Sequence, residues 1–194
     1  MGTLSRERLR LYAAQYYWHV EAFPVHLKAL AERASGTLRE IVLENLAEEE
    51  NPAAPHPKLW HDFASAVGVS EEVLRTSAPQ PAVEALLDIY AKICAERSLE
   101  EAVAALYVYE AQVPEIATTK MDGLRRHCNV TSSKGLAYFT VHEETDRVHR
   151  AAWRKWLEKN CAQADLGGSC VLATAETGLD ALWGTLDAVH AEPC

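Results

Sequence analysis

The chain has 194 residues, 48% of them hydrophobic and 24% charged, which are the proportions of one globular domain large enough to bury a core. Its 19 Lys and Arg against 28 Asp and Glu give a formal net charge of −9, which argues against nucleic acid as a partner, because phosphate contacts need clustered basic side chains. Apolar runs fall short of the roughly 20 residues of a membrane span, and "MGTLSRERLR" has no apolar signal region, so we expect a cytoplasmic protein without a membrane partner.

The helical period recurs in nearly every segment, and no convincing run alternates apolar and polar residues as a strand does. The predicted helices, in chain order, cover residues 5–23 with a continuation to 34, 36–50, 58–68, a short segment from 70, 80–97, 99–113 with a continuation toward 126, a segment that ends near 159, and 170–191. The "ADLGGS" segment is too short to separate domains. The expected fold class is therefore all-α, with a single bundle of about seven or eight helices over residues 1–194.

Several helix ends carry sequence signals. Ser5 is suited to cap the first helix, and Ser98 with Glu101 forms a capping box for the sixth. Pro24 is expected to break or kink the first helix, and Pro114 to kink the sixth. The five cysteines are widely spaced and form no C-x-x-C motif, so neither a disulfide framework nor a thiolate zinc site is expected.

The segment "YFTVHEETDRVHRAAW" holds three potential metal ligands on one predicted helix. Spacings of four and seven residues put Asp146 about 40° and His149 about 20° from His142 around the helix axis, so all three share a face. The alternative interpretation is a solvated stripe of acids and histidines, which is common on exposed helices.

Three further candidate ligands lie elsewhere. Glu110 sits in the otherwise apolar "ALYVYEAQVP", where a buried carboxylate is costly unless it is paired or bound to a metal. Glu49 at a helix end and His56 at the next helix start flank a proline-rich turn that is able to bring them together. Each residue taken alone also has a simpler interpretation. Glu110 then lies on an exposed helix edge, Glu49 is an ordinary acidic helix end, and His56 is a histidine in a turn. Together, three carboxylates and three imidazoles without cysteine suit two iron or manganese ions better than a structural zinc.

The spacing E-x6-H, the Glu in "YVYE" and H-x3-D-x2-H resemble the heme-oxygenase-like di-metal oxidases. The segments "YAAQYYWHVEAFPVHL", "NLAEEEN", "AALYVYEAQVP" and "AYFTVHEETD" are similar to one group within that family, the chlamydial protein associating with death domains (CADD) and its bacterial relatives. This resemblance runs from about residue 4 to about residue 191. It implies a heme-oxygenase-like (TenA/PqqC-like) bundle, often homodimeric, and p-aminobenzoate synthesis for folate biosynthesis.

The resemblance also implies residue roles. The six metal-binding positions of the family match Glu49, His56, Glu110, His142, Asp146 and His149. Lys120 matches the lysine that gives its amino nitrogen to the product, although a solvated surface lysine is the default interpretation of the residue alone. The related enzymes are self-sacrificing: a tyrosine of the protein supplies the aromatic ring, so each chain reacts once.

The family's sacrificial tyrosine lies on a helix before the point where this chain begins, so we expect a bundle that lacks the family's first helix. The remaining candidate redox-active phenols are Tyr12, Tyr16, Tyr17, Tyr107 and Tyr109, of which Tyr12 and Tyr109 are carried forward as catalytic candidates. Most of the five are expected to be core aromatics with a hydrogen-bonded hydroxyl. Loss of one helix exposes an apolar groove, which favours a homodimer.

Three functions are consistent with the sequence. The first is a di-iron p-aminobenzoate synthase that uses two Fe ions (or Fe with Mn), O2 and an external reductant. The second is a di-iron oxygenase acting on an external amino acid or fatty acid, in which case replacing Lys120 with arginine leaves activity intact. The third is a non-catalytic helical protein that binds a partner.

Overall fold

The computed structural model describes residues 4–161 and 168–191, and the described part contains helices and no strand. The helices are α1 (Arg6–Arg33), α2 (Gly36–Glu49), α3 (His56–Ala66), α4 (Glu71–Thr76), α5 (Pro81–Glu96), α6 (Leu99–Cys128), α7 (Ser133–Cys161) and α8 (Gly168–Ala191). The predicted all-α fold class is therefore confirmed. Most of the "ADLGGS" linker lies outside the described residues.

The predicted helix ends agree with the structure where local side-chain chemistry sets them. The Ser5 hydroxyl accepts a hydrogen bond from the Arg8 amide at 3.2 Å, and Ser98 and Glu101 form both bonds of a capping box. Gly68, which ends the segment after α3, has a φ of +89°, a backbone conformation that favours glycine. Helix α3 begins at His56 rather than at residue 58, so the histidine occupies its first turn.

Of the two outcomes expected at Pro24, the break is not found, because α1 is one helix that continues through this proline to Arg33. At Pro114 the helix also continues, as expected, within the uninterrupted α6. Both prolines are buried, so packing on neighbouring helices outweighs the loss of one hydrogen bond within each helix. In α6 this continuity keeps Glu110, before the proline, and Lys120, after it, on one uninterrupted helix.

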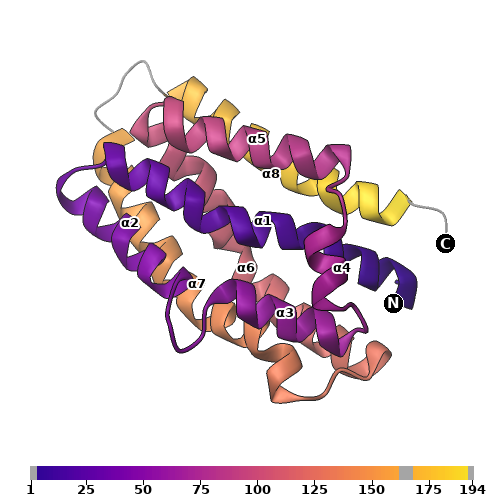
Figure 1. The fold of residues 1–194 in the computed structure, drawn as a ribbon. Helices are drawn as coiled ribbons and strands as arrows, with labels where there is room; N and C mark the ends of the chain where they lie inside the picture. The colour runs from indigo at the N-terminus through magenta and orange to yellow at the C-terminus, as the bar shows by residue number, and fades with distance from the viewer. Residues whose placement is uncertain (1–3, 162–167, 192–194) are drawn as a thin grey trace.

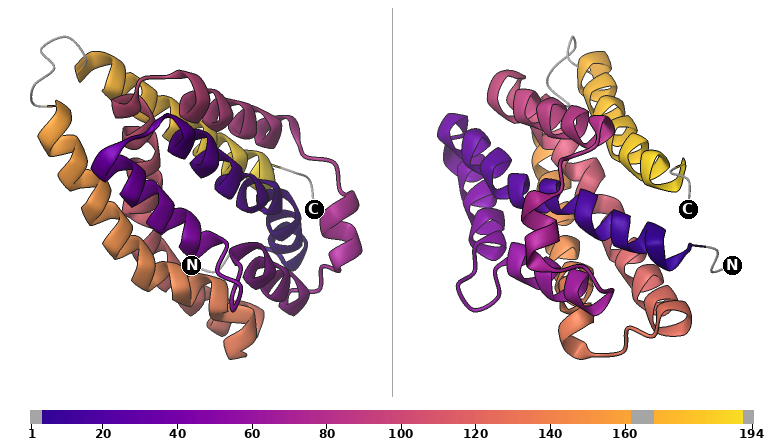
Figure 2. Two further views of the ribbon diagram at one scale, coloured as in Figure 1. Left: turned by 60° about the vertical axis from the view of Figure 1, so that its left-hand side comes forward. Right: turned by 45° about the vertical axis from the view of Figure 1, so that its right-hand side comes forward.

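Helix α1 runs through the middle of the bundle, with α5 and α8 on one side and α2, α3 and α7 on the other (Figure 1). Helices α6 and α7 pack side by side over much of their length (Figure 2). Two apolar clusters fill the interior: one surrounds Trp60 and Phe63, and the other surrounds Tyr90, Leu106 and Trp153. None of the described helices is both long and apolar enough to cross a bilayer.

Gly135 permits close approach between the start of α7 and the end of α3. A Cβ atom added to Gly135 would lie 2.8 Å from the Ala66 Cβ, whereas one added to Gly184 in α8 meets nothing within 4 Å. We expect Gly135→Ala to lower the free energy of unfolding by about 1–3 kcal/mol, because the two helices must separate. Gly184→Ala, the matched control, is expected to leave it unchanged or raise it by up to about 1 kcal/mol. Denaturant unfolding measures both, and equal stabilities for the two variants would contradict the close contact.

Candidate metal centre

Glu49, His56 and His142 converge at one buried point. The exposed fractions of Glu49, His56 and His142 are 6%, 2% and 5%. One potential ligand atom from each residue lies within 4.8 Å of those from the other two. Glu49 Oε2 is 2.8 Å from His56 Nδ1, and Glu49 Oε1 is 4.0 Å from His142 Nε2. A carboxylate and two imidazoles at these separations provide oxygen and nitrogen ligands that suit a first-row transition metal.

The local folding of the chain explains this convergence. Glu49 is the last residue of α2 and His56 the first of α3, so the proline-rich turn between the helices brings both side chains together. His142 comes from the middle of α7, and its Nδ1 donates a hydrogen bond to the Tyr138 carbonyl oxygen at 2.7 Å. A proton held on Nδ1 leaves Nε2, the atom nearer to Glu49, with a free lone pair.

Glu110, Asp146 and His149 form a second group beside the first. Asp146 Oδ1 is 3.6 Å from His149 Nδ1, and Asp146 Oδ2 is buried without a hydrogen-bond partner. The Glu110 carboxylate, 2% exposed, accepts hydrogen bonds from the Asn45 amide at 2.6 Å and from the Trp153 indole at 2.5 Å. The predicted exposed-edge alternative for Glu110 is therefore wrong.

Electrostatics connect the three residues of this second group. Burial and then the charge of Asp146 raise the pKa of Glu110 to about 8, although His149 and the two hydrogen-bond donors oppose the rise. Burial alone would lower the pKa of His149, but its hydrogen bond to Asp146 and the charge of Glu110 outweigh burial and raise it. Two carboxylates that destabilise each other inside a bundle create a strong local demand for positive charge.

The donor set fits bound metal cations. Glu49, Glu110 and Asp146 are all at most 6% exposed, and no described lysine or arginine forms an ion pair with any of them. Histidine nitrogens accompany each carboxylate group, and Asp146 retains an unpartnered buried oxygen. Buried carboxylates in this arrangement are stabilised when a metal ion supplies the missing charge.

Asn45 and Trp153 are supporting residues that the sequence interpretation missed. Both donate hydrogen bonds to Glu110, and Asn45 is 1% exposed while Trp153 is fully buried. Each lies four residues from a candidate ligand, Asn45 before Glu49 and Trp153 after His149, and therefore shares its helix face. That spacing is the sequence signal that identifies them.

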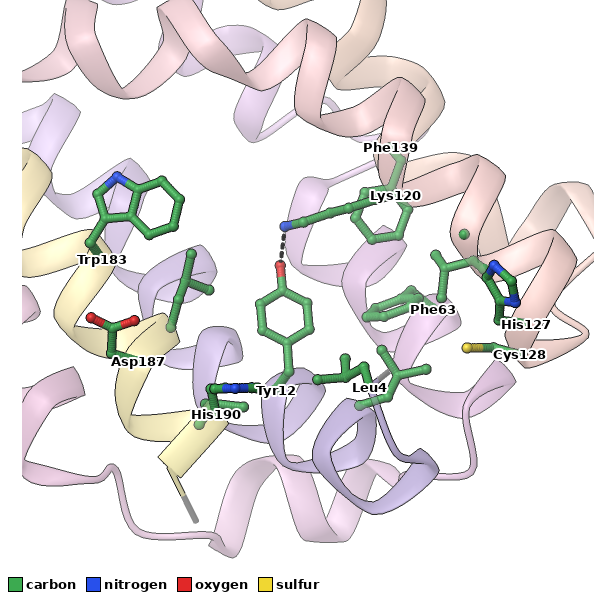
Figure 3. A pocket seen from close by; sticks show the side chains of 15 residues that line it. Leu4, Tyr12, Phe63, Lys120, His127, Cys128, Phe139, Trp183, Asp187 and His190 are labelled. Carbon is green, nitrogen blue, oxygen red and sulfur yellow. Dashed lines mark hydrogen bonds between the residues drawn. The ribbon is translucent and has the colours of Figure 1, made fainter. Parts of the chain in front are cut away.

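Lys120 forms a polar contact with Tyr12 close to the candidate metal ligands. Its Nζ donates a hydrogen bond to the Tyr12 hydroxyl at 2.6 Å and lies 4.7 Å from the centre of the Tyr12 ring (Figure 3). The Lys120 side chain is partly buried and hydrogen-bonded to Tyr12, so the solvated surface lysine expected by default is wrong. Burial lowers the pKa of the Lys120 amine. An inner cavity of about 290 Å³ is lined by Tyr12, Lys120 and His142, which links this pair to the first ligand group.

The other candidate phenols are mostly packed aromatics. The Tyr109 hydroxyl lies 3.1 Å from the Tyr16 hydroxyl, and both line the same inner cavity. Tyr17 pairs with His61 at 3.4 Å, away from that cavity, and Tyr107 is a partly buried side chain packed against the core. The expectation of core aromatics with hydrogen-bonded hydroxyls is thus confirmed for Tyr16, Tyr17 and Tyr109.

A helical bundle whose interior presents carboxylates and imidazoles without cysteine is typical of iron-dependent oxidation sites. The chain belongs to the family of iron-containing redox enzymes, whose sequence pattern matches residues 10–183. It is therefore a redox enzyme by family, as the sequence interpretation predicted.

Two relatives indicate which members of this family the chain resembles. The chain is 35% identical over 196 aligned residues to a 4-aminobenzoate synthase of Chlamydia pneumoniae, covering 100% of this chain and 86% of the relative. It is 34% identical over 203 residues to a 4-aminobenzoate synthase of Nitrosomonas europaea, covering 100% of this chain and 82% of the relative. The predicted resemblance to these synthases is confirmed.

A solved structure confirms the fold. A domain with a heme-oxygenase-like fold from Shewanella denitrificans superposes with a TM-score of 0.82 and 19% identity, covering 97% of this chain and 79% of that chain. At this identity the likeness concerns the fold alone. The predicted heme-oxygenase-like architecture is therefore correct.

Removal of one imidazole tests the first ligand group. His56→Ala is expected to lower the tightly bound iron of the reconstituted protein by half or more, because Glu49 and His142 lose their common partner. His61→Ala is the matched control: His61 lies on the same helix but contacts Tyr17, outside the cluster. Iron content by mass spectrometry, with melting curves to verify folding, gives the answer. A folded His56→Ala protein with undiminished iron would contradict the site.

Metal binding is also expected to depend on pH. Glu110, with a pKa of about 8 in the metal-free protein, is mainly protonated at neutral pH, and a metal ligated by its carboxylate must displace that proton. The apparent affinity should therefore rise with pH, by up to tenfold per unit, and level off above pH 8. Calorimetric titration with Mn²⁺ at pH 6.5, 7.5 and 8.5 measures this, and Glu110→Gln should make the dependence shallower, leaving only the contribution of His149, whose pKa is also raised. A flat profile in the unaltered protein would exclude Glu110 as a ligand.

Proposed function

We propose that this protein is an oxygen-dependent di-iron enzyme that forms 4-aminobenzoate from its own side chains. The observation that carries the proposal is the 2.6 Å hydrogen bond from Lys120 Nζ to the Tyr12 hydroxyl, beside a cavity that reaches His142. The 4-aminobenzoate synthases that cover the whole chain at about 35% identity support it. Dioxygen is the oxidant, and an external reductant supplies electrons.

Two iron ions would be held by Glu49, His56, Glu110, His142, Asp146 and His149, with manganese as an alternative in one position. When bound, they supply the capacity to activate dioxygen, which no side chain has. The chain itself provides the ligands, holds Glu110 through Asn45 and Trp153, and excludes water from the buried donors.

The Lys120–Tyr12 contact has the geometry that the product requires. In 4-aminobenzoate the amino group is para to the carboxyl carbon, and in tyrosine the hydroxyl is para to Cβ. Lys120 Nζ lies against that hydroxyl, and the ring carbon that bears it must exchange its C–O bond for a C–N bond, with the oxygen leaving as water. Release of the product further requires cleavage of the Tyr12 Cα–Cβ bond, oxidation of Cβ to a carboxylate, and oxidative cleavage of the lysine Cε–Nζ bond, which leaves Cε on the chain. Dioxygen, reduced to water, accepts the electrons of these oxidations and supplies the carboxylate oxygen. We therefore assign Tyr12 as the source of the ring.

The environment prepares the amine for this step. Burial lowers the pKa of Lys120, which increases the fraction present as a free amine with a nucleophilic lone pair. The Tyr12 ring is only 7% exposed, and the inner cavity around the pair is mostly apolar. Tyr109 lines the same cavity and is hydrogen-bonded to Tyr16, so we assign it the supporting role of a second oxidisable phenol.

Product formation tests these assignments. Iron-loaded protein given oxygen and reductant is expected to form 4-aminobenzoate, at most one per chain. Lys120→Arg and Tyr12→Phe should each lower the yield at least a hundredfold while iron content stays unchanged. Lys134→Arg, an exposed lysine, and Tyr17→Phe, a buried tyrosine on the same helix as Tyr12, are the matched controls.

Mass spectrometry of the reacted chain locates the atoms lost. We expect alteration at residues 12 and 120 of the same polypeptide, and isotope-labelled tyrosine and lysine should both label the product. Product that forms undiminished in Tyr12→Phe would contradict Tyr12 as the ring source. Product that forms undiminished in Lys120→Arg would contradict the role of the lysine.

Oxidation of an external small molecule is the second candidate function, favoured by the inner cavity of about 290 Å³ beside His142. In that case we expect the Lys120→Arg variant, given an added substrate, to consume oxygen at the same rate as the unaltered protein. The homodimer inferred from sequence stays a prediction, which light scattering of the purified protein would test and a stable monomer would contradict.

A further inference from the structure

A second cavity, which we call the outer cavity, shares the Lys120–Tyr12 pair with the inner cavity but is not lined by His142. Its volume is about 430 Å³, within the range of small-molecule sites. It is bounded by the start of α1, the end of α6 and the end of α8 (Figure 3). Lys120, Tyr12, Phe139, Trp183 and Leu186 line both cavities, so the outer cavity leads directly to the lysine amine.

The lysine amine in the outer cavity has no anionic partner in the described part of the chain. Its one described hydrogen bond goes to the Tyr12 hydroxyl, and Lys120 forms no ion pair among the described residues. A small anion that reaches the amine favours its protonated form, because the Tyr12, Tyr16 and Phe139 rings beside it replace only part of the stabilisation that water would give the charge.

The walls of the outer cavity around the Lys120 amine are aromatic and apolar. Rings of Tyr12, Phe63, Phe139 and Trp183 line the cavity, and Leu9, Leu124 and Val189 complete an apolar lining. Figure 3 shows Trp183 on α8 across the open space from the lysine. Planar rings with an apolar surround favour a flat aromatic body through offset stacking and edge contacts.

The remaining polar lining restricts the charge of a ligand. Asp187 lies on the α8 wall near Trp183, and His127 and His190 lie at other edges of the cavity (Figure 3). A ligand carrying a second carboxylate would place it in a space that already holds the Asp187 charge. An amino or hydrogen substituent at the far end of the ligand meets no such repulsion.

We propose that the outer cavity is a binding site for a small aromatic monocarboxylate, with the carboxylate on Lys120 and the ring between the aromatic walls. The inference deepens the proposed function, since 4-aminobenzoate is a ligand of this class for a chain that has not reacted and still carries the Lys120 amine. Only the choice of 4-aminobenzoate as a ligand rests on the proposed function. Benzoate binding follows from the cavity alone.

Calorimetric titration of iron-loaded protein under anaerobic conditions, where no turnover takes place, tests the site. Benzoate and 4-aminobenzoate are expected to bind, while aniline, which lacks the charge, and decanoate, which lacks the ring, should bind at least tenfold more weakly. Absence of saturable benzoate binding, or tighter binding of decanoate, would overturn the proposal.

Two glycine variants locate the binding without altering Lys120. Gly123 lines the outer cavity and a Cβ added there meets nothing within 4 Å, so Gly123→Leu fills the space without a clash. Gly184→Leu is the matched control, since Gly184 is equally unobstructed but is not part of the cavity lining. We expect at least a tenfold loss of benzoate affinity in Gly123→Leu and none in Gly184→Leu, and equal affinities would overturn the proposal. Benzoate binding in a protein that forms no 4-aminobenzoate would refute the proposed function alone.

Discussion

The burial of three carboxylates in one helical bundle is the constraint on which the rest of the centre depends. Glu49, Glu110 and Asp146 are nearly inaccessible to water, and burial together with the charge of Asp146 disfavours the ionised form of Glu110. Histidine provides only part of the compensating positive charge. The chain thus retains an unfavourable charge arrangement in its interior, which bound metal relieves, and metal binding and stability of the centre are coupled through the same carboxylates.

Long continuous helices give this arrangement its precision. Helix α7 carries His142, Asp146 and His149 on one face, and α6 contributes Glu110 from the neighbouring helix packed along it. A helix fixes the relative direction of side chains four or seven residues apart far more rigidly than a loop does. The turn between α2 and α3 joins the two remaining candidate ligands, Glu49 and His56, and its short length keeps them close.

The lysine–tyrosine pair depends on contacts between distant segments. Lys120 and Tyr12 are separated by 108 positions, and only the packing of α1 against α6 brings the amine to the hydroxyl. Because this contact lies between an inner cavity that reaches His142 and an outer aromatic cavity, the pair connects the metal-ligand cluster with a space of ligand size. The same few rings therefore line both approaches to the lysine amine.

The sequence by itself determined the all-helical class, the capped helix starts at Ser5 and Ser98, and the shared face of His142, Asp146 and His149, because these follow from the helical repeat and from side chains close in the chain. Only the tertiary structure decided that α1 continues through Pro24, that Glu110 is buried, and that Lys120 meets Tyr12. The physical reason is range: local spacing sets which face a side chain occupies, whereas burial and long-range contacts are set by the helices that cover that face.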